Sequence, residues 1–373
     1  MQTINNLHKI WGIDKYITND IFTCYESVDH QLATFTKESY QQNPQLTIDS
    51  VFDIYRSINI VPITYYTEAG LITAIRELAS TPANPIKKNI LGLGNNGGQS
   101  INRFMFPNMM TAEPKGRGSN SLKDRFFDDV KLKRAIKICF EYRDGDNLVK
   151  PTAIRRALEL VTGENIQNFK SLNARSIAEH LCPIMWGNVY DYSAGYGGRL
   201  LGISTSKMKY NYQAVDPNTE TVESLQYLNA LIDQATGNSG TIIQTVSEEY
   251  KPTDIDLAFS SPPYFNLEKY SDEPTQCMVR YTTLQQWIDG YVAPTIENIY
   301  NGLNSDGVFA TNIANYKTTK EEFNVVDPWI ATAEKIGFKH TGIIKMMLNT
   351  RPGVGNDKIA GKEKFEGIYI FKK

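Results

Sequence analysis

The sequence has few cysteines and histidines and no long apolar run. Its cysteines lie far apart, no pair has metal-ligand spacing, and the four histidines do not cluster with them. We therefore expect neither a disulfide framework nor a metal site, and a reducing cytosol fits this cysteine usage best. No apolar run reaches the roughly 18 residues of a membrane span. The N-terminal stretch also lacks an apolar segment long enough for a signal peptide.

An excess of charge is also missing, because the net charge is only −2. The chain as a whole therefore has no basic character that would indicate nucleic acid, although a local basic patch could still bind it. With 41% hydrophobic and 21% charged residues, the composition is that of an ordinary globular chain and excludes a disordered chain or a fibre. The length of 373 residues suggests about two domains.

The expected elements change character near residue 150. Residues 1–80 are mostly helical, and Pro82, Pro85 and GLGNNGG (92–98) then break the pattern. Two helices (151–161 and 174–185) precede strand signals at 189–193, 210–216, 241–247, 256–261 and 308–313, with helical runs at 221–235, 283–303 and 327–337. This alternation indicates a parallel α/β sheet. No helix separates the strands at 341–348 and 367–373, so they are expected to close the sheet as a hairpin.

A glycine-rich turn is expected after the strand at 189–193. In DYSAGYGGRL (191–200), Asp191 begins the turn, and Gly195 and Gly197 permit a tight bend and the close approach of a ligand. The dinucleotide fingerprint requires a third glycine at the position of Leu200, so the nicotinamide interpretation is weakened. The turn alone does not decide between a ligand loop and a plain strand-to-helix connection.

An acidic residue ends the next expected strand. Asp216, in YQAVDPN (212–218), lies 19 residues after Gly197. A carboxylate at this place can accept hydrogen bonds from both ribose hydroxyls of a nucleoside cofactor. An Asp-Pro pair at a strand end is also typical of a helix cap or a turn. The spacing from the glycines favours cofactor binding.

The third motif, SSPPYF (260–265), directly follows an apolar strand. Pro262 and Pro263 predict a stiff, extended loop at the sheet edge where α/β proteins bind ligands. Such a loop suits methyl transfer to an exocyclic amino group, whose lone pair is delocalised into the ring. Ser261 Oγ and the Pro262 carbonyl can accept the two amino hydrogens, and Tyr264 can stack on a flipped base. The alternative is a proline-stiffened loop in which Tyr264 only packs.

In this order and spacing, DYSAGYGG, AVDPN and SSPPY resemble the amino-methyltransferases that modify DNA at adenine N6 or cytosine N4. The resemblance covers about residues 165–373. It implies a Rossmann-like methyltransferase fold with a mixed sheet and a C-terminal β-hairpin, S-adenosyl-L-methionine as cofactor, and double-stranded DNA with a flipped target base as partner. SPPYFNLEKYSDEPTQ (261–276) resembles phage and bacterial modification methylases, so the cytoplasm of a prokaryotic or phage-infected cell is expected.

The resemblance also implies roles for single residues. NIQNFKSLNARSI (165–177) is similar to an extra cofactor motif of the family, which places Asn168 and Phe169 near the methionine end of the cofactor. The other expected cofactor-binding residues are Asp191, Gly195, Gly197, Asp216 and Glu248, and the catalytic residues are Ser261, Pro262, Pro263 and Tyr264. Glu248 is equally well explained as a solvated loop carboxylate. The chain departs from the family's common Asp-Pro-Phe at Asp191-Tyr192-Ser193, and from its common Asp at Ser261.

Two basic segments are candidates for DNA contact. Residues 115–137 hold eight basic and three acidic residues, a net charge of +5, and include Lys131, Lys133 and Arg134. They could follow phosphates or form a solvated helix face. The glycine-rich, basic loop 351–366, which begins with Arg351, is the second candidate.

We expect a methyltransferase domain at 151–373 and a mainly helical accessory region at 1–150 that could recognise the target. About 60 residues separate the glycine turn from the Ser-Pro-Pro-Tyr loop, which is too few for an inserted recognition domain. The expected activity is direct methyl transfer to DNA without a covalent enzyme intermediate. Methylation of RNA or of protein glutamine, and a catalytically silent fold that only binds DNA, are the alternatives.

Overall fold

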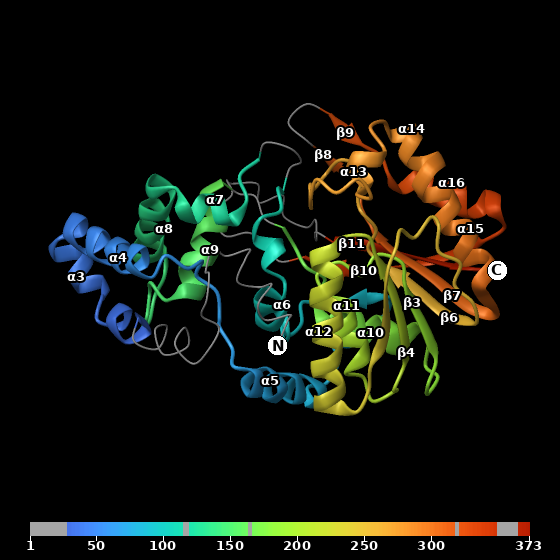
Figure 1. The fold of residues 1–373 in the computed structure, drawn as a ribbon, viewed down its shortest axis with the longest axis horizontal. Helices are drawn as coiled ribbons and strands as arrows, with labels where there is room; N and C mark the ends of the chain where they lie inside the picture. Colours follow the sequence, from blue (N-terminus) through green and yellow to red (C-terminus); the bar gives the residue numbers. More distant parts are fainter. Residues whose placement is uncertain (1–27, 115–118, 163–165, 318–320, 349–364) are drawn as a thin grey trace. The chain divides into compact units, whose positions relative to one another are not determined.

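The computed structural model describes residues 28–114, 119–162, 166–317, 321–348 and 365–373 (Figure 1). These residues form two compact units. Unit 1 holds the described residues up to Leu71 together with those of Ser100–Gln167 and Glu268–Tyr270. Unit 2 holds Ile72–Gln99, Asn168–Leu267 and the described residues of Ser271–Lys373.

Unit 1 is built mainly from short helices. They are α3 (Lys37–Gln42), α4 (Pro44–Ile58), most of α6 (Gln99–Met105), the 3-10 turn η1 (Pro107–Met110), α7 (Leu122–Phe127), α8 (Asp129–Tyr142) and α9 (Pro151–Thr162). Side-chain caps mark the N-termini of several of these helices. Asn43 caps α4, Ser121 forms a capping box with Asp124 in α7, and Asp128 caps α8. The apolar faces of these helices form a core in which the Tyr55 hydroxyl donates to the Val149 carbonyl at 2.6 Å.

Unit 2 contains a nine-stranded sheet in the order β1-β2-β10-β11-β7-β6-β3-β4-β5. The strands are β1 (Ile86–Lys87), β2 (Ile90–Leu91), β3 (Asn188–Asp191), β4 (Asn211–Asp216), β5 (Gly240–Gln244), β6 (Ile255–Ser260), β7 (Leu303–Ile313), β10 (Lys339–Met347) and β11 (Phe365–Lys372). The five strands β7-β6-β3-β4-β5 are parallel. β11 lies between β7 and β10 and is antiparallel to both, so the sheet is mixed. A separate two-stranded sheet pairs β8 (Tyr316–Lys317) with β9 (Glu322–Phe323).

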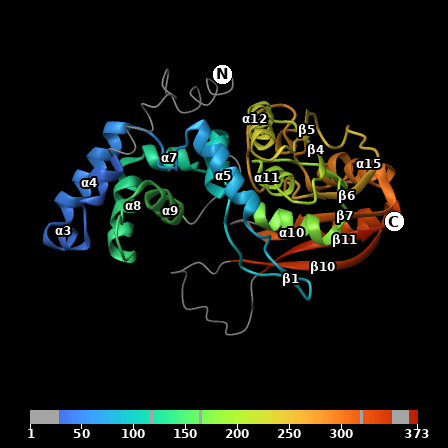
Figure 2. The same cartoon turned by 90° about the horizontal axis from the view of Figure 1, so that it is seen from below.

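Helices cover both faces of the large sheet (Figures 1 and 2). The helices are α5 (Glu68–Ser80), which begins in unit 1, α10 (Ser171–Leu181), α11 (Gly198–Ser204), α12 (Thr219–Thr236), α13 (Cys277–Arg280), α14 (Leu284–Trp287), the π-helical turn η2 (Ile288–Val292), α15 (Ala293–Gly302) and α16 (Val326–Ile336). On the α15 and α16 side, Tyr192 and Phe309 pack with Trp329 in the main core. On the other side, Phe259 meets Phe169, which lies just before α10. Alternate strand residues therefore point to the two helix layers, as expected for a sheet buried on both faces.

This architecture confirms the expected fold class: a Rossmann-like α/β sheet with a C-terminal antiparallel pair, together with a mainly helical N-terminal region. The expected strands and helices from residue 151 onward are present within a few residues. One expected helix, 283–303, is divided into α14, η2 and α15, where Pro294 near the start of α15 has no N–H to donate. In the part of the chain that the structure describes, no helix is long and apolar enough to cross a membrane.

The division between the units differs from the expected boundary at residue 150. Helix α9 belongs to unit 1, so that unit extends to Gln167. Ile72–Gln99 belongs to unit 2 because β2, within this segment, pairs with β10 and lengthens the sheet. Strands β1 and β2 have only two residues each, which is too short for a periodic pattern of apolar residues. The pairing of β2 with a distant part of the chain could therefore not be predicted from the local sequence.

Candidate functional site

The candidate site of unit 2 lies at the carboxyl ends of the parallel strands. β3, β4 and β6 end at Asp191, Asp216 and Ser260. Because neighbouring parallel strands end at the same edge of a sheet, these three residues lie along the edge formed by the carboxyl ends of the strands. β11 runs in the opposite direction and begins at this edge, where Gly367 pairs with Ile313 at the end of β7.

The glycine turn between β3 and α11 is tied to the end of β4. Gly195 and Gly197 have φ angles of +54° and +69°, which side chains disfavour. The Gly195 N–H donates to Asp216 Oδ2 at 2.9 Å, and the Asn218 N–H donates to Asp216 Oδ1 at 3.0 Å. Burial raises the pKa of Asp216 to about 6, although the two backbone hydrogen bonds oppose the shift. The structure therefore brings the predicted cofactor residues Gly195 and Asp216 into direct contact, and Gly197 lies two residues further on in the same turn.

Asp191 is the buried centre of this edge. Its side chain is fully buried, and it accepts hydrogen bonds from four groups. Oδ2 accepts from Arg199 Nε and from the Tyr212 hydroxyl, both at 2.7 Å. Oδ1 accepts from Ser260 Oγ at 2.7 Å and from the Ser193 N–H at 3.2 Å. Asp191 thus connects β3, the glycine turn, α11, β4 and β6. These hydrogen bonds indicate that Asp191 holds the turn in place.

The segment before α10 lies against the glycine turn. The Asn168 side-chain amide donates to the Tyr196 carbonyl at 2.7 Å. The Phe169 ring meets Phe259 of β6 edge-on, with centroids 5.5 Å apart, and the Arg199 guanidinium lies 5.7 Å from its centre. The structure therefore brings Asn168 and Phe169 to the same turn as the other predicted cofactor residues.

The Ser-Pro-Pro-Tyr loop begins directly after β6. Ser261, Pro263 and Tyr264 are partly exposed, whereas Pro262 is buried. The Tyr264 hydroxyl donates to the Asn312 carbonyl at the end of β7 at 3.2 Å, and its ring borders the main core. Among the described residues, no hydrogen-bond partner of Ser261 Oγ is found, whereas the neighbouring Ser260 is bound to Asp191. The two adjacent serines therefore have different environments.

Glu248 follows β5 and is engaged by protein groups. Its carboxylate accepts from Arg280 at 3.0 Å and from the Tyr281 hydroxyl at 2.8 Å, and only 7% of its side chain is exposed. Burial raises its pKa. The interpretation of Glu248 as a solvated loop carboxylate is therefore wrong, and a contact with a ligand would have to use its remaining lone pairs.

Two of the predicted DNA-binding lysines in unit 1 are paired with carboxylates. Lys131 contacts Asp128 at 2.8 Å, and Lys133 contacts Asp49 at 2.7 Å. Arg134 is exposed on α8. The positive charge of α8 is thus partly neutralised by the carboxylates of Asp128 and Asp49. Arg351 lies outside the described residues.

Sequence reasoning missed several residues of the site. Arg199 shows no motif of its own, and only the structure reveals its ion pair with Asp191. Glu366 lies at the start of β11, where burial raises the pKa of its carboxyl group and a hydrogen bond with the Asn312 side chain opposes that shift. Phe265, directly after the Ser-Pro-Pro-Tyr loop, has a φ of +33°, which is strained for an aromatic residue. None of these features has a signal in the local sequence.

Comparisons with known proteins give likenesses of fold alone. The sequence matches no protein-family model and no curated protein. Among solved structures, precorrin-6y C5,15-methyltransferase from Geobacter metallireducens is 13% identical with a TM-score of 0.35, over 56% of this chain and 91% of that chain. A TehB-like SAM-dependent methyltransferase from Corynebacterium glutamicum is 14% identical with a TM-score of 0.32, over 60% and 96%.

Fibrillarin from Aeropyrum pernix, in complex with natively bound S-adenosyl-L-methionine, is 10% identical with a TM-score of 0.32, over 53% of this chain and 73% of that chain. At these values the likenesses carry no argument about substrate. The fold assignment of unit 2 rests on its own strand order and on the antiparallel strand β11.

Proposed function

We propose that unit 2 binds S-adenosyl-L-methionine and methylates an exocyclic amino group of a nucleic-acid base, cytosine N4 or adenine N6 in double-stranded DNA. The observation that carries the proposal is the Ser-Pro-Pro-Tyr loop beginning at the sheet edge where Asp216 holds the Gly195 turn. Ligands of open α/β sheets bind at this edge. The remaining support is the chemistry of the side chains placed there.

The donor and acceptor groups at this edge fit the proposed cofactor. Each Asp216 oxygen accepts one backbone N–H, so each retains an acceptor site for a ribose hydroxyl. Asn168 and Phe169 lie beside the same turn, where they would border the methionine end. When bound, S-adenosyl-L-methionine supplies an electrophilic methyl group.

Ser261 and Tyr264 would hold the target base. Ser261 Oγ and the Pro262 carbonyl would accept the two amino hydrogens, which localises the nitrogen lone pair and orients it for attack. The Tyr264 ring would stack on the flipped base, and its hydroxyl remains anchored on the Asn312 carbonyl. The amino nitrogen gains the methyl group and loses one proton to solvent, so no covalent bond to the enzyme is required.

The two adjacent serines provide a matched test. Ser261→Ala should abolish transfer of a radiolabelled methyl group and leave the melting temperature and cofactor affinity unchanged. Ser260→Ala removes a buried donor from Asp191, so it should lower stability by about 1–3 kcal/mol and weaken cofactor binding. If Ser261→Ala retains full activity, or loses stability in the same way as Ser260→Ala, the proposed role of the loop is wrong.

The substrate is decided by offering the wild-type protein DNA, RNA and a glutamine-containing peptide in parallel. Methyl transfer to DNA, with the product identified as N4-methylcytosine or N6-methyladenine, supports the proposal. Transfer only to RNA or peptide assigns one of the alternative substrates. DNA binding without transfer to any of the three would identify a silent methyltransferase fold.

A further inference from the structure

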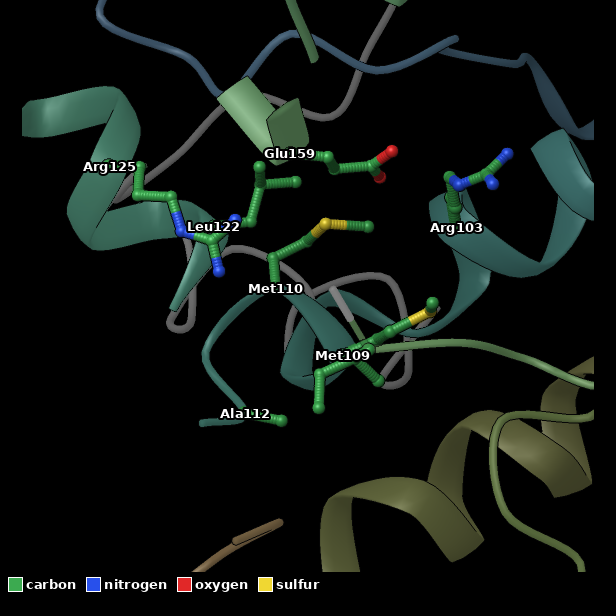
Figure 3. Close-up of a pocket in the computed structure, with 8 residues that line it drawn as sticks. Arg103, Met109, Met110, Ala112, Leu122, Arg125 and Glu159 are labelled. Carbon is green, nitrogen blue, oxygen red and sulfur yellow. The ribbon is translucent and has the colours of Figure 1, made fainter. Parts of the chain in front are cut away.

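Unit 1 contains a small pocket between α6, η1, α7 and α9, and Figure 3 shows its lining, which includes Met109, Met110 and Leu122. The pocket has room for about one water molecule. It therefore offers no place for a target base, in contrast to the Ser-Pro-Pro-Tyr loop of unit 2.

The turn that ends the Ser-Pro-Pro-Tyr loop is held by Tyr316 of β8. The Tyr316 hydroxyl donates to Asn266 Oδ1 at 2.8 Å and accepts from the Asn266 N–H at 3.4 Å. The Leu267 N–H donates to the Tyr264 carbonyl at 2.8 Å, so Phe265 and Asn266 are the two central residues of a closed turn. A single hydroxyl thus binds both the backbone and the side chain of this turn.

The ring of Tyr316 acts on the other central residue of the turn. Phe265 has a φ of +33° and only 5% of its surface is exposed. Its ring lies 5.7 Å from Phe323 of β9 and 6.4 Å from Trp287, measured between ring centroids. Phe323 in turn stacks on the Tyr316 ring at 5.1 Å. A strained backbone conformation persists only where its surroundings hold it, and Tyr316 belongs to these surroundings.

The stretch of chain that carries Tyr316 is itself anchored. It follows β7, whose Asn312 carbonyl accepts from the Tyr264 hydroxyl at 3.2 Å. The Asn315 side chain accepts from the Val325 N–H at 2.9 Å and from the Val326 N–H at 3.0 Å, where α16 begins. The stretch after β7 therefore holds the loop at two points, and its own position is fixed at the start of a helix.

We propose that Tyr316 is a positioning residue for methyl transfer: its hydroxyl holds the turn at Asn266 and thereby sets where Ser261 and Tyr264 meet the target base. The inference rests on the proposed function of unit 2. The rate of transfer depends steeply on the alignment of the reacting atoms, so a small displacement of the loop is enough to slow it. Tyr316 contacts neither the base nor the cofactor in this proposal and acts only through the turn.

The first test compares Tyr316→Phe with Tyr300→Phe in the full-length protein. Tyr316→Phe keeps the ring that stacks on Phe323 and removes only the hydroxyl. Tyr300 lies near the end of α15, where β7 begins, and hence at the opposite edge of the sheet. Its hydroxyl makes no hydrogen bond with the residues that the structure describes, so Tyr300→Phe is the matched control.

The single-turnover rate of methyl transfer is measured at saturating cofactor and DNA, beside the Kd for S-adenosyl-L-methionine and the melting temperature. Tyr316→Phe should slow transfer by about three- to tenfold, the effect of losing one or two neutral hydrogen bonds. The Kd and the melting temperature should stay unchanged, because Asn266 is partly exposed and water can replace the hydroxyl. Tyr300→Phe should alter none of the three. An unchanged transfer rate in Tyr316→Phe, or an equal weakening of cofactor binding, would overturn the proposal.

Amide hydrogen exchange tests the support of the turn without any substrate. In a peptide that spans residues 261–267, Tyr316→Phe should speed exchange by a similar factor, because the Asn266 N–H loses its acceptor. Tyr300→Phe should exchange like the wild type. Equal exchange in the wild type and in Tyr316→Phe would mean that the hydroxyl does not hold the turn.

Asn266→Ala removes the same contact from the other side. If both residues act through this contact, the double variant should transfer no more slowly than the slower single variant. Additive losses would show that Tyr316 acts through another group, which overturns the proposal.

Failure of the inference and failure of the proposed function are distinguishable. A wild type that methylates DNA at the same rate as Tyr316→Phe would overturn the positioning role and leave the proposed function intact. A wild type that transfers no methyl group to DNA, RNA or peptide would refute the proposed function, and hydrogen exchange would still decide whether Tyr316 holds the turn.

Discussion

The buried carboxyl group of Asp216 should make cofactor binding depend on pH. Burial raises its pKa from 3.8 to about 6, and in the proposed cofactor site the ribose hydroxyls would require the ionised group as an acceptor. With a pKa of about 6, roughly nine-tenths of the carboxyl groups are ionised at pH 7 and about one-tenth at pH 5. The apparent Kd for S-adenosyl-L-methionine should therefore rise about tenfold between pH 7 and pH 5, as measured by calorimetry.

The stability of the free protein should change in the opposite direction. Between pH 3.8 and about 6 the native state holds a proton on Asp216 that the unfolded chain has released, so this group's contribution to stability falls as pH rises through that window. Asp216→Asn should bind the cofactor weakly at every pH and lose both dependences. Asp191 and Arg199 also act on Asp216, and Glu248 is a second carboxyl group with a raised pKa. Glu248→Gln is therefore the control that should retain the tenfold change. A wild-type Kd that is equal at pH 7 and pH 5 would refute the reasoning.

Two further predictions concern Arg199, which pairs with the buried Asp191, and Tyr264 of the Ser-Pro-Pro-Tyr loop. Arg199→Gln leaves Asp191 as a buried carboxylate without its cation, so the free energy of unfolding, measured with urea, should fall by about 3–5 kcal/mol. A decrease below about 1 kcal/mol would contradict the role of this ion pair. Tyr264→Ala should remove about 1–3 kcal/mol of stacking energy on the base, measured as a lower methylation efficiency at unchanged cofactor affinity. Tyr264→Phe keeps the ring and should retain most of the activity. Equal defects in the two variants would assign the effect to the hydrogen bond from the Tyr264 hydroxyl to the Asn312 carbonyl.

Much of unit 2 could be predicted because its signals are local. Strands β3, β4 and β6 are short apolar runs followed by turn residues, and each run ends at a polar residue of the motif. Parallel strands place these ends at one edge, so Gly195, Asp216 and Ser261 could be assigned to one region from the sequence alone. The expected hairpin at the C-terminus follows from the lack of a helical pattern between its two strands.

The partners within the site could not be predicted in the same way. The motif predicts that Asp191 belongs to the ligand turn, but the structure shows that its oxygens accept hydrogen bonds from Arg199, Tyr212 and Ser260. These contacts join residues up to 69 positions apart, and no spacing rule selects them. The pairing of Lys133 on α8 could not be predicted for a related reason, because its partner Asp49 comes from a different helix.

The hydrogen bonds at the sheet edge divide the candidate site into two parts that are held differently. The glycine turn is fixed from both sides, by Asp216 at Gly195 and by Asp191 at Ser193, before any ligand is present. Cofactor binding would therefore require little ordering of this turn, which favours affinity. The Ser-Pro-Pro-Tyr loop is held by its prolines, by Tyr264 at Asn312, and by the packing that maintains the strained Phe265. Because Ser261 lies between a fixed strand end and this strained turn, small changes around Phe265 should alter the position of Ser261 Oγ, and hence methyl transfer, more than they alter cofactor binding.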